Sequence, residues 1–250
     1  MTLSAIRPVI FLPGMIMPAA EHYAPLLTVL NHGIQPVLKE LELYTTELPV
    51  SEYRLSMEVQ GLRRVVEQHD FDGFHLVAYS GGGAVALAFV ARYPELVTSL
   101  ALVEPAVIPT LKWFQSEDDY LNAMERVMTY PSGEQMQEYM RLKLRSGVKP
   151  PPLEPWMAKR SACMQAMIQA FSVSKIEMGH LRRFQKPVYL AIGSLSNPIE
   201  ERKAQTMARL FSDFQVEVYE GRHHFDPPQV AEPERFAKAL LGLWERSEQA

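Results

Sequence analysis

Short apolar runs alternate with segments of helical periodicity along the first part of the chain. The apolar runs have the length and content of buried strands, and they occupy residues 9–12, 35–43, 74–78 and 99–103. Between them, apolar residues recur every three to four positions, which predicts helices over residues 22–30, 53–69 and 82–93. This β-α order predicts an α/β fold, with a mostly parallel sheet flanked by helices on both faces.

The alternation stops between residues 106 and 186, where only helical patterns follow, the last of them over 157–171. It resumes with strands at 188–192 and 214–219 and helices at 200–211 and 232–246. We therefore predict a core of about six strands from residues 1–105 and 187–250, with a helical cap inserted over 106–186. The edges of the sheet are expected near 35–43 and 214–219.

Composition supports an inserted segment. Residues 106–186 hold 12 Lys and Arg, 8 Asp and Glu, and 8 of the 13 Met residues, so their formal charge is +4 while the rest of the chain carries −8. The net charge of −4 over 250 residues lacks the basic footprint of a nucleic-acid-binding protein. No run approaches the ~18 apolar residues of a membrane helix.

The sequence shows no pattern typical of a secretion signal or of a cysteine-rich metal site. The first residues, Met-Thr-Leu-Ser-Ala-Ile-Arg-Pro, show no signal peptide pattern. The single cysteine, Cys163, excludes an internal disulfide and a cysteine-rich metal site. We expect a cytoplasmic monomer or homodimer that acts on a small molecule without a metal or cofactor.

The segment Val77-Ala-Tyr-Ser80-Gly-Gly-Gly places a serine in a tight turn between a predicted strand and a predicted helix. This is the G-x-S-x-G nucleophile elbow, with Ala78 in place of the first glycine. The same glycines also fit a G-x-G-x-x-A dinucleotide pattern, and Glu104 lies 21 residues beyond Gly83. That fingerprint usually opens the first β-α unit, however, and two strands precede it here.

With these motifs the chain resembles the α/β-hydrolase fold family over nearly all its length. Pro13-Gly14-Met15 is similar to the family's His-Gly-x segment, with Pro13 in place of the histidine. The resemblance implies an oxyanion hole made by the N–H groups of Met15 and Gly81. Because the first predicted strand begins at Val9, the family's first two strands are expected to be absent.

The catalytic histidine of the family lies in a Gly-x-x-His-Phe segment after the last strand. Gly221-Arg-His-His224-Phe225 matches it, which assigns the general base to His224 and leaves His223 as the alternative. The other histidines lie within predicted strands and helices, where structural or surface roles are expected.

The acid member of a triad is less directly marked. Much of the family carries an Asp where this chain has Ser196, which cannot act as an anion. Glu200 and Glu201 fit charges in the first turn of a helix. We assign the acid to Glu104, at the end of the strand 99–103, because hydrogen bonding to His224 would give a buried carboxylate a partner.

A serine nucleophile suits acyl transfer through an acyl-enzyme. We therefore expect a hydrolase of carboxylic esters or related acyl substrates, with a C–C bond hydrolase and a non-catalytic small-ligand-binding homologue as alternatives. The Met-rich cap favours an apolar or aromatic acyl group. The residues expected to bind it are Met17, Tyr79, Leu195 and Phe225.

Overall fold

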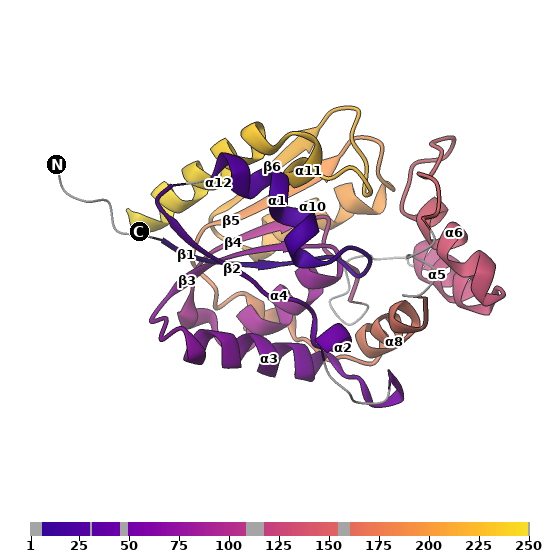
Figure 1. Cartoon of the computed structure of the whole chain (residues 1–250), viewed down its shortest axis with the longest axis horizontal. Coiled ribbons are helices and arrows are strands. Elements are labelled where there is room, and N and C mark those ends of the chain that lie inside the picture. Colours follow the sequence, from indigo (N-terminus) through magenta and orange to yellow (C-terminus); the bar gives the residue numbers. More distant parts are fainter. Residues whose placement is uncertain (1–6, 31, 46–49, 109–117, 155–160, 250) are drawn as a thin grey trace.

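The fold is described from a computed structural model, which covers residues 7–30, 32–45, 50–108, 118–154 and 161–249 (Figure 1). A six-stranded sheet forms its centre, in the order β2-β1-β3-β4-β5-β6, and every neighbouring pair is parallel. The strands are β1 (Arg7–Leu12), β2 (Ile34–Leu38), β3 (Phe74–Tyr79), β4 (Val97–Val103), β5 (Val188–Gly193) and β6 (Phe214–Tyr219). The predicted fold class and the predicted edges of the sheet are confirmed.

The strand order determines where a site can form. The chain moves from β1 outward to β2, and then crosses to the other side of β1 to form β3. In open parallel sheets, a crevice forms beyond the carboxyl ends of the strands at such a reversal. The segments that follow β1 and β3, with Met15 and Ser80, therefore lie side by side at this edge.

Helices cover both faces of the sheet, as Figure 1 shows for α1 and α12 on one side and α3 and α4 on the other. Successive residues of β1 divide between the two layers: Val9 and Phe11 pack with α1 and α12, whereas Ile10 and Leu12 pack on the opposite face. The helices of the first layer are α1 (Ala19–Val29), α11 (Pro228–Ala231) and α12 (Pro233–Glu248). Those of the second are α3 (Leu55–Gln68), α4 (Gly81–Arg92) and α10 (Ile199–Leu210), and short 3-10 turns occupy Val50–Glu52 and Pro94–Leu96.

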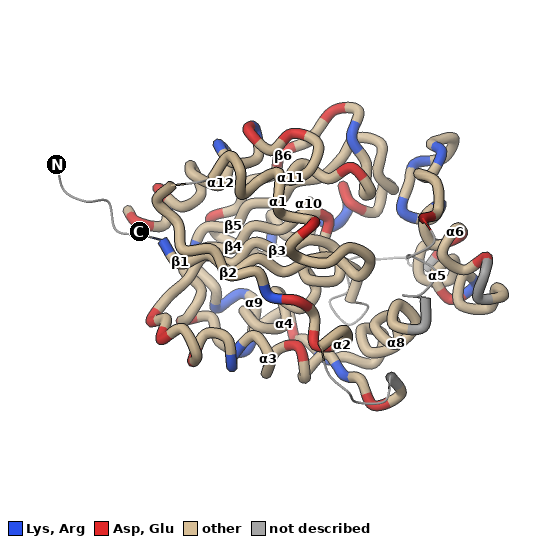
Figure 2. The backbone as a smooth tube through the Cα atoms, in the orientation of Figure 1, with Lys and Arg blue, Asp and Glu red and all other residues tan. Residues whose placement is uncertain are grey.

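Burial on both faces explains why the central strands read as continuous apolar runs. All six residues of β3 are buried, and β3, β4 and β5 contain no Asp, Glu, Lys or Arg. Figure 2 shows the charged residues on the surrounding helices and loops instead. None of the helices in the described ranges combines the length and the apolarity needed to cross a bilayer.

Between β4 and β5 the described chain is helical. The helices are α5 (Asp118–Thr129), α6 (Ser132–Leu142), α8 (Ser161–Ser172) and α9 (Met178–Leu181). Met140 and Met167 are fully buried in the same apolar cluster as Ile10 and Leu12 of β1. The helical segment thus shares one apolar interior with the sheet, and the division into core and cap at residues 105 and 186 stays a prediction. Residues 157–160 of the predicted helix 157–171 lie outside the described ranges.

The strand predicted over 35–43 is wrong in extent. β2 ends at Leu38, and a short helix, α2 (Glu42–Thr45), follows. The buried Glu58 carboxylate accepts hydrogen bonds from the backbone N–H groups of Glu42 (2.9 Å) and Leu43 (3.2 Å). These side-chain acceptors replace strand pairing, because a carboxylate can satisfy two N–H groups at a helix start.

Candidate active site

Ser80 occupies a sharp turn between β3 and α4. Its backbone angles are φ 49° and ψ −115°, a conformation that non-glycine residues rarely adopt and that costs about 1–3 kcal/mol. The turn is held by backbone hydrogen bonds on both sides: the Ser80 N–H donates to the Val103 carbonyl (3.0 Å), and the Ser80 carbonyl accepts from Ala106 (2.7 Å). The strained serine is therefore fixed from β4 as well as from its own element.

Two of the glycines are needed for close backbone approach. A β-carbon on Gly82 would lie 2.4 Å from the Pro13 carbonyl oxygen, to which the Gly82 N–H donates a 3.0 Å hydrogen bond. A β-carbon on Gly83 would lie 2.6 Å from the Pro105 side chain. Because real β-carbons essentially never come so close to another atom, glycine lets the elbow pack against the segments after β1 and β4.

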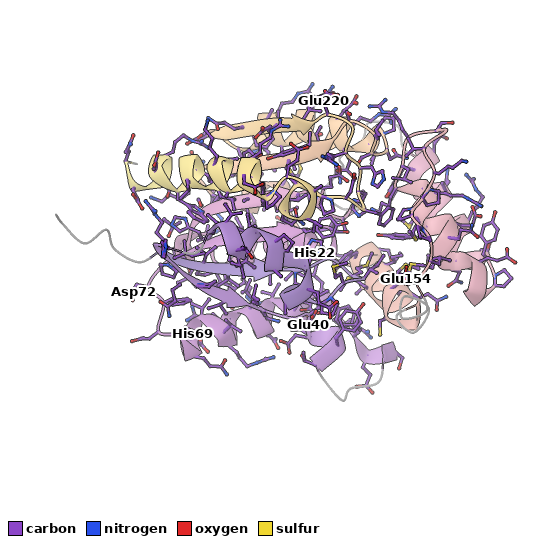
Figure 3. The ribbon with its side chains drawn as sticks, turned by 45° about the horizontal axis from the view of Figure 1, so that its top comes forward. His22, Glu40, His69, Asp72, Glu154 and Glu220 are labelled. Carbon is purple, nitrogen blue, oxygen red and sulfur yellow. The ribbon has the colours of Figure 1, made fainter. Side chains whose placement is uncertain are left out.

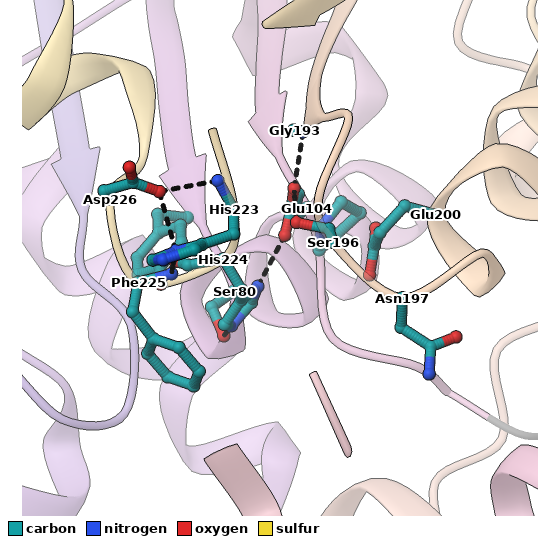
Figure 4. Close-up of polar contacts among 12 residues, drawn as sticks. Ser80, Glu104, Gly193, Ser196, Asn197, Glu200, His223, His224, Phe225 and Asp226 are labelled. Atoms are coloured by element: carbon teal, nitrogen blue, oxygen red, sulfur yellow. Dashed lines mark hydrogen bonds and ion pairs between the residues drawn. The ribbon is translucent and has the colours of Figure 1, made fainter. Parts of the chain in front are cut away.

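The structure brings Ser80, His224 and Glu104 together in one buried row (Figure 4). Ser80 Oγ lies 3.1 Å from His224 Nε2, and His224 Nδ1 lies 2.7 Å from Glu104 Oε2. The three residues are 3%, 2% and 2% exposed, respectively. Each follows a different strand (β3, β6 or β4), so the parallel sheet places all three at its carboxyl edge.

Glu104 accepts two further hydrogen bonds through its other oxygen. Ser196 Oγ donates to Oε1 at 2.6 Å, and the Gly193 N–H donates to it at 2.7 Å. Burial raises the pKa of Glu104, whereas these two hydrogen bonds lower it. Because the carboxylate only accepts, its three contacts are those of the ionised form. Ser196 thus stands beside the carboxylate of Glu104 and donates to it.

The imidazole of His224 is neutral in this setting. Burial is the main reason that the pKa of His224 lies well below its ordinary value, and the charge of Lys143 lowers it further. If Nδ1–H donates to Glu104, Nε2 carries the lone pair that faces Ser80 Oγ. The Tyr79 hydroxyl donates to the His224 carbonyl, which fixes the loop that carries the ring.

The alternative residues have other partners. His223 Nδ1 lies 2.7 Å from Asp226 Oδ1, and this contact raises the pKa of His223. Glu200, although in the first turn of α10 as predicted, is 2% exposed and forms a 2.5 Å ion pair with Lys203. Glu201 pairs with Arg145 at the surface.

The backbone nitrogen of Met15 lies close to Gly81, the residue after Ser80. The nitrogen of Met15 lies 3.6 Å from the position that a β-carbon on Gly81 would take. Within the described ranges, neither the Met15 nor the Gly81 N–H donates a hydrogen bond. The Tyr44 hydroxyl donates to the Met15 carbonyl and holds this loop in place. These two N–H groups are therefore the candidates for the predicted oxyanion hole.

Two neighbouring cavities lie near this edge of the sheet, and Ser80 lines the smaller of them. The smaller one, of about 230 Å³, is lined by Ser80 and His224 and by the predicted residues Met17, Tyr79 and Phe225. The larger one, of about 370 Å³, lies under α5, α6 and α8. Met15 and Tyr139 line both. Leu195 lines neither and is tied to Arg222 and Arg145 through its backbone, which leaves its predicted role without support.

Further polar residues surround the smaller cavity. The buried His22 stacks on Tyr79 with ring centroids 4.5 Å apart, and burial lowers the pKa of His22 to about 3. His22 and Glu154 both line the cavity, whereas the exposed His69 and Asp72 lie on the far side of the molecule (Figure 3). In the described part of the chain, no three His, Cys, Asp or Glu residues group as a metal site requires.

Sequence reasoning missed two residues beside the serine. Tyr139, from α6, lines the smaller cavity together with Ser80, and the ammonium of Lys143 lies 5.3 Å from the centre of the Tyr139 ring. Both residues are buried, at 1% and 3% exposure. The only signal in the sequence was their spacing of four, which places them on one face of a helix. Nothing in that spacing shows which face meets the serine.

The sequence matches the model of the alpha/beta hydrolase family over residues 9–239. The chain belongs to the alpha/beta hydrolase family. Its fold superposes on a bacterial membrane phospholipase A with a TM-score of 0.75 and 18% identity, covering 98% of this chain and 80% of the other. For carboxylesterase CesB from Bacillus subtilis the TM-score is 0.67 at 15% identity, over 95% and 83% of the chains. At these identities the likeness shows the fold alone.

A plant relative shares a shorter stretch. The protein named probable lysophospholipase BODYGUARD 4, from Arabidopsis thaliana, is 34% identical over 80 residues. That stretch is 32% of this chain and 18% of the relative. The match therefore covers less than a fifth of the relative's length.

Proposed function

We propose that this protein is a serine hydrolase that cleaves carboxylic esters or related acyl substrates through Ser80, His224 and Glu104. The observation that carries the proposal is the continuous row of contacts from Ser80 Oγ to His224 Nε2 (3.1 Å) and from His224 Nδ1 to Glu104 Oε2 (2.7 Å). A nucleophile, a base and an orienting acid in this geometry define the triad arrangement. Their chain order, Ser-acid-His, is that of the alpha/beta hydrolase family.

In the acylation step, His224 Nε2 takes the Ser80 proton while Oγ attacks the substrate carbonyl carbon. The carbonyl oxygen becomes an oxyanion and binds the N–H groups of Met15 and Gly81, each worth roughly 3 kcal/mol in comparable enzymes. His224 then donates its proton to the leaving alcohol oxygen, and the C–O bond breaks. Glu104 stabilises the imidazolium that forms between these proton transfers.

In the deacylation step, His224 removes a proton from water, and the resulting hydroxide attacks the acyl-enzyme. The Ser80 oxygen leaves and regains its proton from His224, which releases the carboxylic acid. The same two N–H groups hold the second oxyanion. Both half-reactions therefore use one base and one oxyanion site.

The printed names of the similar proteins support an ester substrate. A phospholipase A, a carboxylesterase and a probable lysophospholipase are all ester hydrolases by name. The smaller cavity, which His224 lines, provides space beside the serine for a leaving group. Its apolar lining, including Met17 and Phe225, fits an organic ester.

The proposal is tested by covalent labelling and turnover. A fluorophosphonate should label Ser80 at neutral pH, and the protein should hydrolyse p-nitrophenyl esters from a panel of acyl lengths. Ser80→Ala should abolish labelling and lower kcat by at least about a thousandfold, because the nucleophile is lost. A folded wild-type protein that neither reacts with the probe nor turns over any ester would exclude this function and favour a ligand-binding role.

A further inference from the structure

A lysine of the helical segment is buried next to Tyr139, which lines the cavity that contains Ser80. Lys143 follows α6 and is only 3% exposed, although lysine is almost never buried without a partner. Its ammonium lies 5.7 Å from the centre of the Tyr120 ring and 5.3 Å from that of Tyr139. Such a position is costly for a charge, which suggests a role that requires it.

The backbone holds Lys143 against the loop that supports the triad acid. The Lys143 carbonyl accepts from the Asn197 N–H (2.9 Å), and Leu144 pairs with Ser196 in an isolated β-bridge. On the other side, the Arg145 N–H donates to the Leu195 carbonyl (2.9 Å). Ser196 in turn donates to Glu104. The position of the ammonium relative to the candidate triad is thus fixed through the main chain.

The charge of Lys143 is not balanced by an ion pair within the described residues. Of the two carboxylates buried nearby, Glu200 pairs with Lys203 at 2.5 Å, and Glu104 receives hydrogen bonds from His224, Ser196 and Gly193. The same ammonium lowers the pKa of His224. An anion bound at Lys143 would offset the repulsion between the Lys143 ammonium and a charged His224 imidazolium.

Tyr139 lies between Lys143 and Ser80. The Lys143 ammonium is 5.3 Å from the centre of the Tyr139 ring, and Tyr139 lines the smaller cavity together with Ser80. A carboxylate at Lys143 and a carbonyl at Ser80 would then belong to one short molecule.

The larger cavity contains this ammonium together with a second polar group. Lys143, Tyr120 and Tyr139 line it. The Tyr120 hydroxyl is buried and has no well-aligned hydrogen-bond partner among the described residues. The remaining lining is largely apolar, with Met124, Met128 and Phe171, while the exposed Glu125 lies at its rim. The cavity therefore presents one cation and one buried tyrosine hydroxyl inside a largely apolar wall.

The two cavities can be assigned to the two parts of an ester. His224 must protonate the leaving oxygen, and it lines only the smaller cavity of the two. The leaving group therefore belongs in the smaller cavity. The acyl group, on the opposite side of the carbonyl carbon, then extends into the larger cavity toward Lys143.

We propose that this hydrolase acts on esters whose acyl chain ends in a carboxylate, which Lys143 and Tyr120 bind in the larger cavity. The inference rests on the proposed function, because it takes Ser80 as the nucleophile. The substrate class is the monoester of a short dicarboxylic acid. Lys143 is the residue that determines this specificity, and it takes no part in the proton transfers.

The test compares monoethyl glutarate with ethyl pentanoate, which has the same chain length but ends in a methyl group. Acid release, followed at constant pH, should show kcat/KM higher for monoethyl glutarate by about 10- to 100-fold, the factor expected for a hydrogen bond to a charged group. Lys143→Met should lower this ratio toward one, and Tyr120→Phe should lower it in part. Lys175→Met removes the same charge at an exposed position of the helical segment and should keep the wild-type ratio.

Equal kcat/KM for the two esters in the wild type would overturn the inference, as would a Lys143→Met variant that keeps the wild-type ratio. If Lys143→Met does not fold, Lys143→Gln tests the ratio instead. Calorimetry on the Ser80→Ala protein separates the two proposals, because it measures binding without turnover. Tighter binding of monoethyl glutarate that is lost in Ser80→Ala/Lys143→Met supports the carboxylate site even if Ser80 is never labelled. Equal binding of the two esters excludes the site and leaves the serine hydrolase proposal intact.

Discussion

The end of β4 and the start of α10 each bury a carboxylate at the same edge of the sheet, but the two have different partners. Glu104 and Glu200 are both 2% exposed, and burial raises the pKa of each. Glu104 meets the imidazole of His224 at 2.7 Å, whereas Glu200 meets the ammonium of Lys203 at 2.5 Å. A titrating base beside one carboxylate favours chemistry there. The buried ion pair with Lys203 beside the other favours a structural role.

The inserted helices contribute to this edge as well. Tyr139 of α6 lines the cavity that contains Ser80, and the ammonium of Lys143, just after α6, lies 5.3 Å from the centre of the Tyr139 ring. The strand ends thus supply the groups that would move protons, and the helical segment supplies a fixed charge. The following predictions test whether the two carboxylates differ in function as their partners indicate.

The largest effect is expected for Glu104→Gln. The amide keeps the shape but cannot stabilise the imidazolium of His224, and the equivalent loss in serine proteases lowers kcat by about 10⁴-fold. We expect a loss of at least about 10³-fold in kcat for a neutral ester such as ethyl pentanoate, measured on protein shown by circular dichroism to be folded. A loss below tenfold would mean that Glu104 is not the orienting acid.

Glu200→Gln should instead affect stability. It leaves the Lys203 ammonium buried without its counter-charge, which typically costs 3–5 kcal/mol. We expect the free energy of unfolding in urea to fall by about 3 kcal/mol, with a far smaller loss of kcat than in Glu104→Gln. The double variant Glu200→Gln/Lys203→Met should recover much of the stability, because the buried charge is removed.

Glu201→Gln is the matched control for Glu200→Gln. Glu201 is the next residue of α10, but its side chain is 54% exposed where it pairs with Arg145. Exposed ion pairs contribute at most about 1 kcal/mol. A loss of stability as large in Glu201→Gln as in Glu200→Gln would show that burial does not distinguish these positions.

Of the variants in the candidate triad's surroundings, the smallest loss of kcat is expected for Ser196→Ala. Its hydroxyl donates to Glu104 at 2.6 Å and lowers the pKa of that carboxyl. Without this hydrogen bond the Glu104 pKa rises, so the carboxylate becomes protonated at a higher pH. The acid limb of the pH profile of kcat/KM therefore shifts to higher pH. We expect about a tenfold loss of kcat at neutral pH and a larger loss at acid pH. A uniform loss at every pH would contradict this role.

The sequence determined the fold and the nucleophile turn. The β-α order follows from apolar periodicity, because parallel strands buried on both faces must be apolar throughout. All seven residues from Ala78 to Ala84 are small or aromatic, with Ser80 at their centre. This pattern fits the strained strand-to-helix turn of a nucleophile elbow. His224 was also identifiable, because it follows the last strand in a short recognisable segment. Each of these features depends on residues close together in the chain.

Tertiary structure decided which charged groups meet. Glu104, Glu200 and Glu201 are the same residue type in the sequence. Only the tertiary structure shows that Glu104 and Glu200 are buried and that Glu104 contacts His224. Tyr139 lines the cavity beside the serine from a helix whose facing side the sequence left open. Burial and partner control the pKa and the role of a charged side chain. The contact between Glu104 and His224 joins residues 120 positions apart, which local patterns do not encode.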